Sequence, residues 1–296
     1  MLAVVFLIMG FWVVAPGLFG RVTPRPYTGK EGEKISVVVS FYPLYFMASE
    51  IGGDRMEVKN LTPAGVEPHD YEPTARDMVI LQRAKLLILN GGNFEAWGGK
   101  MKEELKSSGV TVLSAGDGLF ENNDPHIWLS PPIAKLMATK ISVALITLDK
   151  ENQDYYEANV DKLIEKLSDL DRRYSLELGK CNKKDFVTSH TAFGNMAKTY
   201  GLNQIAIAGI SPDDEPSTKQ LAEIARFARE KEIKYIFFER LVNPKMAETI
   251  AEEVGAKTLV LDPIEGISDN DMKQGKNYLT LMEENLYNLR IALQCQ

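Results

Sequence analysis

The chain has 296 residues, of which 45% are hydrophobic and 25% are charged. This length and composition suffice to bury one large core or two smaller ones, and they exclude a mainly disordered chain. The formal net charge is -7 and no dense cluster of lysine and arginine is present, which argues against binding to nucleic acid. An acidic balance suits a protein that handles cations, although many soluble proteins share it.

The N-terminus begins with an uncharged hydrophobic segment. Residues 2–20 carry no charge, and that length can cross a bilayer. No lysine or arginine precedes the segment and Pro16 follows its best cleavage site, so an uncleaved anchor fits better than a cleaved signal peptide. Arg21, Arg25 and Lys30 follow the segment, and the positive-inside rule would keep them cytoplasmic. Cleavage and anchoring both stay open, and we expect residues 1–34 to be a signal or anchor with a linker.

The chain has two cysteines, Cys181 and Cys295, and they form no CxxC motif. A metal site built from thiolates is therefore not indicated. One disulfide and two free thiols are both compatible with the sequence.

The first half of the folded region alternates between strand and helix patterns. Short apolar runs indicate buried strands, and apolar residues at three- and four-residue spacing indicate helices. The strands are expected at 35–40, 55–61, 86–89 and 111–113, with helices around 47–51, 74–83 and 97–107. This alternation predicts a mostly parallel sheet with helices on both faces.

A long stretch without strand signals follows. From 131 to about 179 apolar residues recur at helical spacing, which predicts one or two long helices. The alternation then restarts, with strands expected at 185–188, 204–207, 235–238 and 258–261 and helices around 193–200, 217–231 and 244–254.

The predicted fold class is α/β, with two lobes that each hold a mostly parallel sheet flanked by helices, bridged by a single long helix. The predicted boundaries are 35–150 for the first lobe, 151–180 for the bridging helix, with 132 as an alternative start, and 181–296 for the second lobe.

The three histidines of the chain share one kind of position. His69 lies in a loop before a helix, His126 precedes the long helical region, and His190 follows the strand at 185–188. In open α/β sheets, ligands bind outside the carboxyl ends of the strands, so residues from two lobes can converge there. Any one of these histidines alone is more often a surface or hydrogen-bonded loop residue than a ligand, but the context shared by all three predicts a common metal site.

Asp262 is the predicted fourth ligand. It ends the strand at 258–261 and precedes Pro263, a position that resembles that of His190. Three imidazoles and one carboxylate form a closed four-coordinate site that suits zinc. An aspartate before proline is also common in turns and helix caps, so position alone does not select Asp262.

The segments around these residues resemble a known family, the substrate-binding proteins of zinc and manganese ABC importers, called the ZnuA-like, TroA-like or cluster A-I group. The resemblance covers the chain from Ile35 to the C-terminus. The matching motifs are Pro-His-x-Tyr-Glu-Pro at 68–73, Asp-Pro-His-x-Trp-Leu at 124–129, Ser-His-x-Ala-Phe-Gly at 189–194, Tyr-Gly-Leu at 200–202, Glu-Pro-Ser at 215–217 and Leu-Asp-Pro at 261–263.

The resemblance implies a monomeric, extracytoplasmic metal-binding protein with no enzymatic activity, which holds one ion between two lobes and delivers it to an ABC-type membrane permease with its ATPase subunit. Its implied ligands are His69, His126, His190 and Asp262. Manganese-type members tend to have a carboxylate where this chain has His190, so zinc is the favoured ion and manganese the alternative.

Two features depart from the family pattern. Bacterial relatives usually carry a lipid-modified cysteine at the mature N-terminus, but no cysteine precedes Cys181. Many zinc-specific relatives also carry a loop rich in histidine and acidic residues after the first ligand, and none follows His69. Neither a lipid anchor nor a metal-collecting loop is therefore supported.

Other roles remain open at this level. Glu67, Asp70 and Glu239 are candidates to orient the ligands, or are solvated surface carboxylates. A mononuclear zinc hydrolase also uses three histidines, but Asp262 would fill its open position and no HExxH motif is present. A metal-independent adhesin on the same scaffold is the third alternative.

Overall fold

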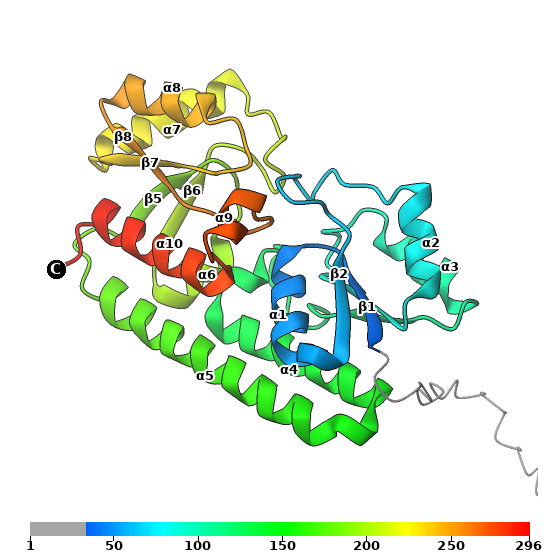
Figure 1. Cartoon of the computed structure of the whole chain (residues 1–296). Coiled ribbons are helices and arrows are strands. Elements are labelled where there is room, and N and C mark those ends of the chain that lie inside the picture. The colour runs from blue at the N-terminus through cyan, green and yellow to red at the C-terminus, as the bar shows by residue number, and fades with distance from the viewer. Residues whose placement is uncertain (1–33) are drawn as a thin grey trace, which may run out of the picture.

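The computed structural model describes residues 34–296, so the predicted N-terminal signal or anchor lies outside the described residues. Two four-stranded sheets, both parallel throughout, form the centres of two lobes (Figure 1). The first sheet has the order β2-β1-β3-β4 and the second β6-β5-β7-β8. The strands are β1 Ile35–Val39, β2 Met56–Asn60, β3 Leu86–Leu89, β4 Thr111–Ser114, β5 Asp185–Thr188, β6 Asn203–Ala206, β7 Tyr235–Phe238 and β8 Lys257–Val260.

Helices cover the sheets and connect the lobes (Figure 1). Between residues 34 and 296 they are α1 Tyr42–Gly52, α2 Ala75–Arg83, α3 Gly98–Lys106, α4 Pro131–Leu148, α5 Gln153–Leu178, α6 Gly194–Tyr200, α7 Thr218–Glu230, α8 Lys245–Val254, α9 Asp269–Lys273 and α10 Tyr278–Ala292, with 3-10 turns η1 Gly53–Arg55, η2 Ile127–Leu129 and η3 Lys150–Asn152. The predicted class of two α/β lobes is confirmed.

The first sheet is buried on both faces. Along β1, Val37 and Val39 face the large core under α1, α4 and α5, whereas Val38 faces a smaller core under α2 and α3. Side chains alternate across a strand, so a strand covered on both sides needs an unbroken apolar run. This is why residues 35–39 are almost wholly apolar.

The long central region forms two helices, α4 and α5, joined by η3. Helix α5 has 26 residues and is therefore about 39 Å long. It packs against α1 and α4 of the first lobe and against α6 and α10 of the second, as Figure 1 shows. Its buried side chains recur every three or four residues: Tyr156, Val160, Leu163, Leu167, Leu170, Tyr174 and Leu178. The bridge is thus held by a continuous apolar stripe, and the predicted domain boundaries around it remain predictions.

Helix α4 is long and apolar enough to cross a membrane by composition alone. It nevertheless packs closely against α5 and α1, and buries Ala134, Met137, Ile141 and Leu145 in the main core. Its hydrophobicity is accounted for by this packing.

Cys181 and Cys295 form a disulfide, which decides between the two alternatives left open by the sequence. The bond joins the segment after α5 to the end of the chain, beyond α10.

Tyr174 links the bridging helix to α10. Its buried hydroxyl donates a hydrogen bond of 2.6 Å to the carbonyl oxygen of Met282. Tyr174→Phe is expected to lower the free energy of unfolding by about 1 kcal/mol, because a buried carbonyl loses its partner. Tyr287→Phe on the exposed face of α10 is the matched control, since Tyr287 is 62% exposed. Equal denaturant midpoints for the two variants would contradict the expected difference.

Candidate metal centre

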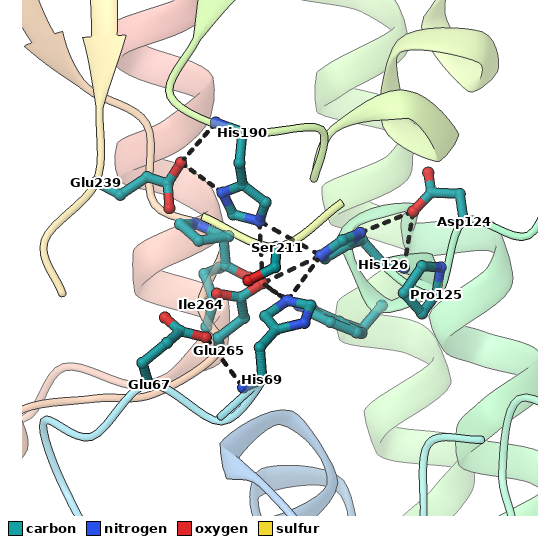
Figure 2. A network of polar contacts seen from close by, with 12 residues as sticks. Glu67, His69, Asp124, Pro125, His126, His190, Ser211, Glu239, Ile264 and Glu265 are labelled. Carbon is teal, nitrogen blue, oxygen red and sulfur yellow. Dashed lines mark hydrogen bonds and ion pairs between the residues drawn. The ribbon is translucent and has the colours of Figure 1, made fainter. Parts of the chain in front are cut away.

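The three histidines meet between the two lobes, at the carboxyl ends of the strands. His69 lies in the loop between β2 and α2, His126 lies between β4 and α4, and His190 follows β5. Glu265, in the loop after β8, completes the group (Figure 2). His126, His190 and Glu265 are buried, while His69 keeps a small exposed fraction.

The four side chains direct one atom each toward a common point. The Nε2 atom of His126 lies 3.2 Å from Nε2 of His69 and 3.4 Å from Nε2 of His190. Oε1 of Glu265 lies 3.2 Å from Nε2 of His69, 3.2 Å from Nε2 of His126 and 3.4 Å from Nε2 of His190. In a tetrahedral zinc site with bonds near 2.05 Å, ligand atoms are separated by about 3.3 Å. These five separations have this size, and all four ligand atoms lie within 4.8 Å of one another, so the residues fit a four-coordinate ion.

The short separations make the pKa of each of these side chains depend strongly on the charges of the others. Burial alone would lower the pKa of His126 and of His190, but carboxylates outweigh it. Hydrogen bonds to Asp124 and Glu265 raise the pKa of His126, and Glu239 and Glu265 raise the pKa of His190 well above 6.5. Burial would likewise raise the pKa of Glu265, yet the histidines hold it well below its usual range. The site thus favours positive charge next to an ionised carboxylate.

Two carboxylates orient the imidazoles from behind. Nδ1 of His126 lies 2.8 Å from Oδ1 of Asp124, and Nδ1 of His190 lies 2.7 Å from Oε1 of Glu239 (Figure 2). When Nδ1 donates a proton to a carboxylate, the lone pair of Nε2 is left free for a metal. The geometry supports Glu239 as an orienting residue, whereas sequence reasoning did not select Asp124 for this role.

The other two candidate orienting residues do not contact an imidazole. Oε1 of Glu67 accepts a hydrogen bond of 3.2 Å from the backbone nitrogen of His69. Asp70 is exposed, and the proximity of its carboxylate raises the pKa of Asp213 in the opposite lobe.

Removing the carboxylate behind His190 is expected to weaken metal binding. Glu239→Ala deletes the acceptor for both the backbone nitrogen and Nδ1 of His190. Loss of such a partner typically costs 10–100-fold in metal affinity, so we expect a loss of about that size in zinc titrations. Glu223→Ala, an exposed glutamate on α7, is the control. Unchanged affinity in a folded Glu239→Ala variant would show that His190 needs no orienting carboxylate.

The structure does not bring Asp262, the fourth ligand expected from the sequence, into the cluster, which consists of the three histidines and Glu265. Oδ2 of Asp262 pairs with Nε of Arg240 at 3.0 Å, and Oδ1 accepts a hydrogen bond of 2.8 Å from the backbone nitrogen of Ile264. Both oxygens are therefore engaged away from the histidines. Burial raises the pKa of Asp262 to about 6, against the opposing effects of the Ile264 amide and Arg240.

Glu265 occupies the position expected for Asp262 because the chain turns between them. Ile264 has a φ of +57°, and this turn points the next side chain toward the imidazoles (Figure 2). The sequence held one signal for it: Glu265 is the single acidic residue between Pro263 and Ser268. Because Asp262 ends a predicted strand and precedes Pro263, it was the expected ligand instead.

Two α/β lobes bridged by a long helix, with a buried cluster of three histidines and one glutamate between them, define a two-lobed metal-binding protein of the substrate-binding class. Residues 37–292 match the family described as ZnuA, zinc-uptake complex component A, periplasmic. The chain belongs to this family. A relative from Bacillus subtilis, the high-affinity zinc uptake system protein ZnuA, is 37% identical over 294 residues that span 93% of this chain and 92% of the relative.

Solved structures agree with this assignment. The Zn(II)-bound ZnuA-like domain of Streptococcus pneumoniae AdcA is 37% identical, with a TM-score of 0.80 over 88% of this chain and 99% of that domain. The chain spans 55% of the length of the zinc-binding lipoprotein AdcA from this organism. The laminin-binding protein Lmb of Streptococcus agalactiae, described as having adhesin and metal-transporting activity, is 36% identical, with a TM-score of 0.81 over 88% of this chain and 99% of Lmb.

Proposed function

We propose that the protein captures zinc outside the cytoplasm and delivers it to an ABC-type permease with its ATPase subunit. The observation that carries this proposal is the convergence of four ligand atoms, from His69, His126, His190 and Glu265, at the separations of a tetrahedral site. The zinc-related names of the similar proteins support the same cargo.

Zinc is favoured over manganese by the chemistry of the donors. Three imidazole nitrogens and one carboxylate suit zinc, whereas manganese prefers sites richer in oxygen. The histidine at position 190 therefore matters for selectivity. Manganese is the alternative cargo, and it is expected to bind more weakly.

The site suits the binding and transport of an ion better than it suits catalysis. A catalytic zinc site keeps one coordination position open for water or substrate. Here four protein side chains would occupy all four positions around a tetrahedral ion. We therefore propose that the protein is not an enzyme. An ester hydrolysis assay with zinc present is expected to show no turnover.

The approach to the site is acidic. A surface pocket of about 600 Å³ reaches Glu67, two residues from His69, and is also lined by Asp213, Asp214 and Glu215. The three exposed carboxylates, Asp213, Asp214 and Glu215, outnumber the one lysine of the pocket, Lys245, and a concave surface of net negative charge raises the local concentration of cations. This pocket is the proposed route by which a cation reaches the histidines.

The proposed cellular setting follows from the relatives and from the N-terminus. The family description says periplasmic, and AdcA is named a lipoprotein. We propose that this protein acts as a monomer on the outer side of the membrane, secreted or anchored through residues 2–20.

The test is a metal titration. The purified protein is stripped with a chelator and titrated with zinc and with manganese by calorimetry, with a competing chelator to reach high affinities. We expect one zinc per chain at sub-micromolar affinity and weaker binding of manganese. Absence of zinc binding would overturn the proposal, and tighter binding of manganese would overturn its choice of cargo.

A further inference from the structure

Ile264 adopts a conformation that its side chain disfavours. Its φ of +57° lies in the left-handed region, which bulky β-branched residues rarely enter. The side chain is fully buried in the main core. Such a conformation persists only where surrounding contacts impose it, and it often marks a functional position.

The contacts that impose it centre on Asp262. Oδ1 of Asp262 accepts a hydrogen bond of 2.8 Å from the backbone nitrogen of Ile264 and so closes the turn. Asn285 holds the backbone of Asp262 from α10, accepting from its nitrogen at 2.8 Å and donating to its carbonyl oxygen at 2.6 Å. From the other side, Nε1 of Trp128 donates a hydrogen bond of 2.7 Å to the carbonyl oxygen of Pro263.

Arg240 fixes the carboxylate that closes the turn. Its Nε lies 3.0 Å from Oδ2 of Asp262, and its Nη2 donates to Oε2 of Glu284 at 2.6 Å. Asp262 is therefore held on one oxygen by a cation that is itself anchored to α10, while the other oxygen holds the amide of Ile264.

We propose that Asp262 is a positioning residue that holds Ile264 in the left-handed conformation and thereby aims Glu265 at the three histidines. Without the bond to its amide, Ile264 relaxes to a negative φ and the carboxylate of Glu265 leaves the cluster. The Asp-Pro pair at the end of β8 thus serves the site through the turn and not as a ligand. This inference rests on the proposed zinc-binding function of the cluster.

Variants of Asp262 and Glu265 distinguish a positioning role for Asp262 from a direct ligand role for Glu265. Asp262→Ala removes the acceptor for the amide of Ile264 and is expected to weaken zinc binding by about tenfold or more. Asp262→Asn keeps an oxygen that accepts from this amide but loses the contact with Arg240, so its loss is expected to be several-fold and smaller than that of Asp262→Ala. In a Glu265→Gln background, Asp262→Ala is expected to add less than about twofold, because residues that act through one another are not additive.

Zinc affinity is measured for each variant in the purified protein, and thermal unfolding without metal checks that each is folded. Equal losses for Asp262→Asn and Asp262→Ala would overturn the inference, because a direct ligand or a required charge behaves in that way. Full additivity with Glu265→Gln would overturn it as well. If Asp262→Ala does not fold, Arg240→Met tests the same support, because it removes the partner of Asp262 at a partly exposed position. A several-fold loss of zinc affinity is expected. Unchanged zinc affinity would contradict the inference.

The failures of the two proposals are distinguishable. If the unaltered protein binds no zinc, or if Glu265→Gln binds it equally well, the proposed site itself is wrong. If Glu265→Gln loses affinity while Asp262→Ala does not, only the positioning role of Asp262 is wrong.

Discussion

Glu265→Gln is expected to lower zinc affinity by roughly 100-fold or more. The change keeps the size of the side chain but removes the charge of the carboxylate, whose Oε1 lies 3.2–3.4 Å from Nε2 of each of the three histidines. A residue that only orients a ligand already contributes about 10–100-fold, so loss of a ligand should cost at least the upper end of that range. Competition titrations with a chelator of known affinity measure the change.

The control for this charge removal is Glu223→Gln. Glu223 lies on the exposed face of α7, so the variant has the same change in net charge but leaves the site intact. Its zinc affinity should match that of the unaltered protein. Similar affinities in both variants would remove Glu265 from the ligand set.

Zinc affinity is expected to fall steeply as the pH is lowered, and this decline should begin at a pH above 6.5. Carboxylates raise the pKa of His126 and of His190 above that ordinary value, so zinc competes with protons for these two imidazoles at a higher pH than it would for free histidines. Each displaced proton costs about tenfold per pH unit below the pKa concerned, which gives about 100-fold per unit once both histidines are protonated. Glu265 adds nothing to this decline, because its pKa is held well below its usual range.

Calorimetric titrations in buffers of different ionisation enthalpy test this expectation directly, since they count the protons released when zinc binds. We expect zinc binding to release protons, and to release more of them as the pH is lowered from about 8 to about 6.5. A dissociation constant that stays flat from about pH 8 to about pH 6.5, with no proton release, would contradict the electrostatic description of the site.

Most of the fold was predictable because both sheets are buried on two faces. Central strands such as β1 and β3 are then almost wholly apolar, which makes them visible as short apolar runs. The bridging helix was visible because one apolar stripe serves both lobes. Helices α9 and α10 were not predicted from the sequence, although the buried residues of α10 recur at helical spacing. The pairing of Cys181 with Cys295 depends on how the chain returns after α10, which local patterns do not contain.

The candidate metal site was predictable to the extent that its residues occur at strand ends. The three histidines were identified because the topology of a parallel sheet gathers the carboxyl ends of its strands at one edge. Glu265 was missed because its direction is set by the φ of one residue, Ile264, and by the contacts of Asp262. Those contacts come from Arg240 in the loop after β7 and from α10, so no pattern local to residues 262–265 reveals them.

The most direct test of the central claim is a crystal structure of the protein grown with zinc, with the ion located by its anomalous scattering. We predict one zinc ion bound by Nε2 of His69, His126 and His190 and by the carboxylate of Glu265, with bonds of about 2.0–2.2 Å. Zinc bound elsewhere, or bound by Asp262 in place of Glu265, would contradict it.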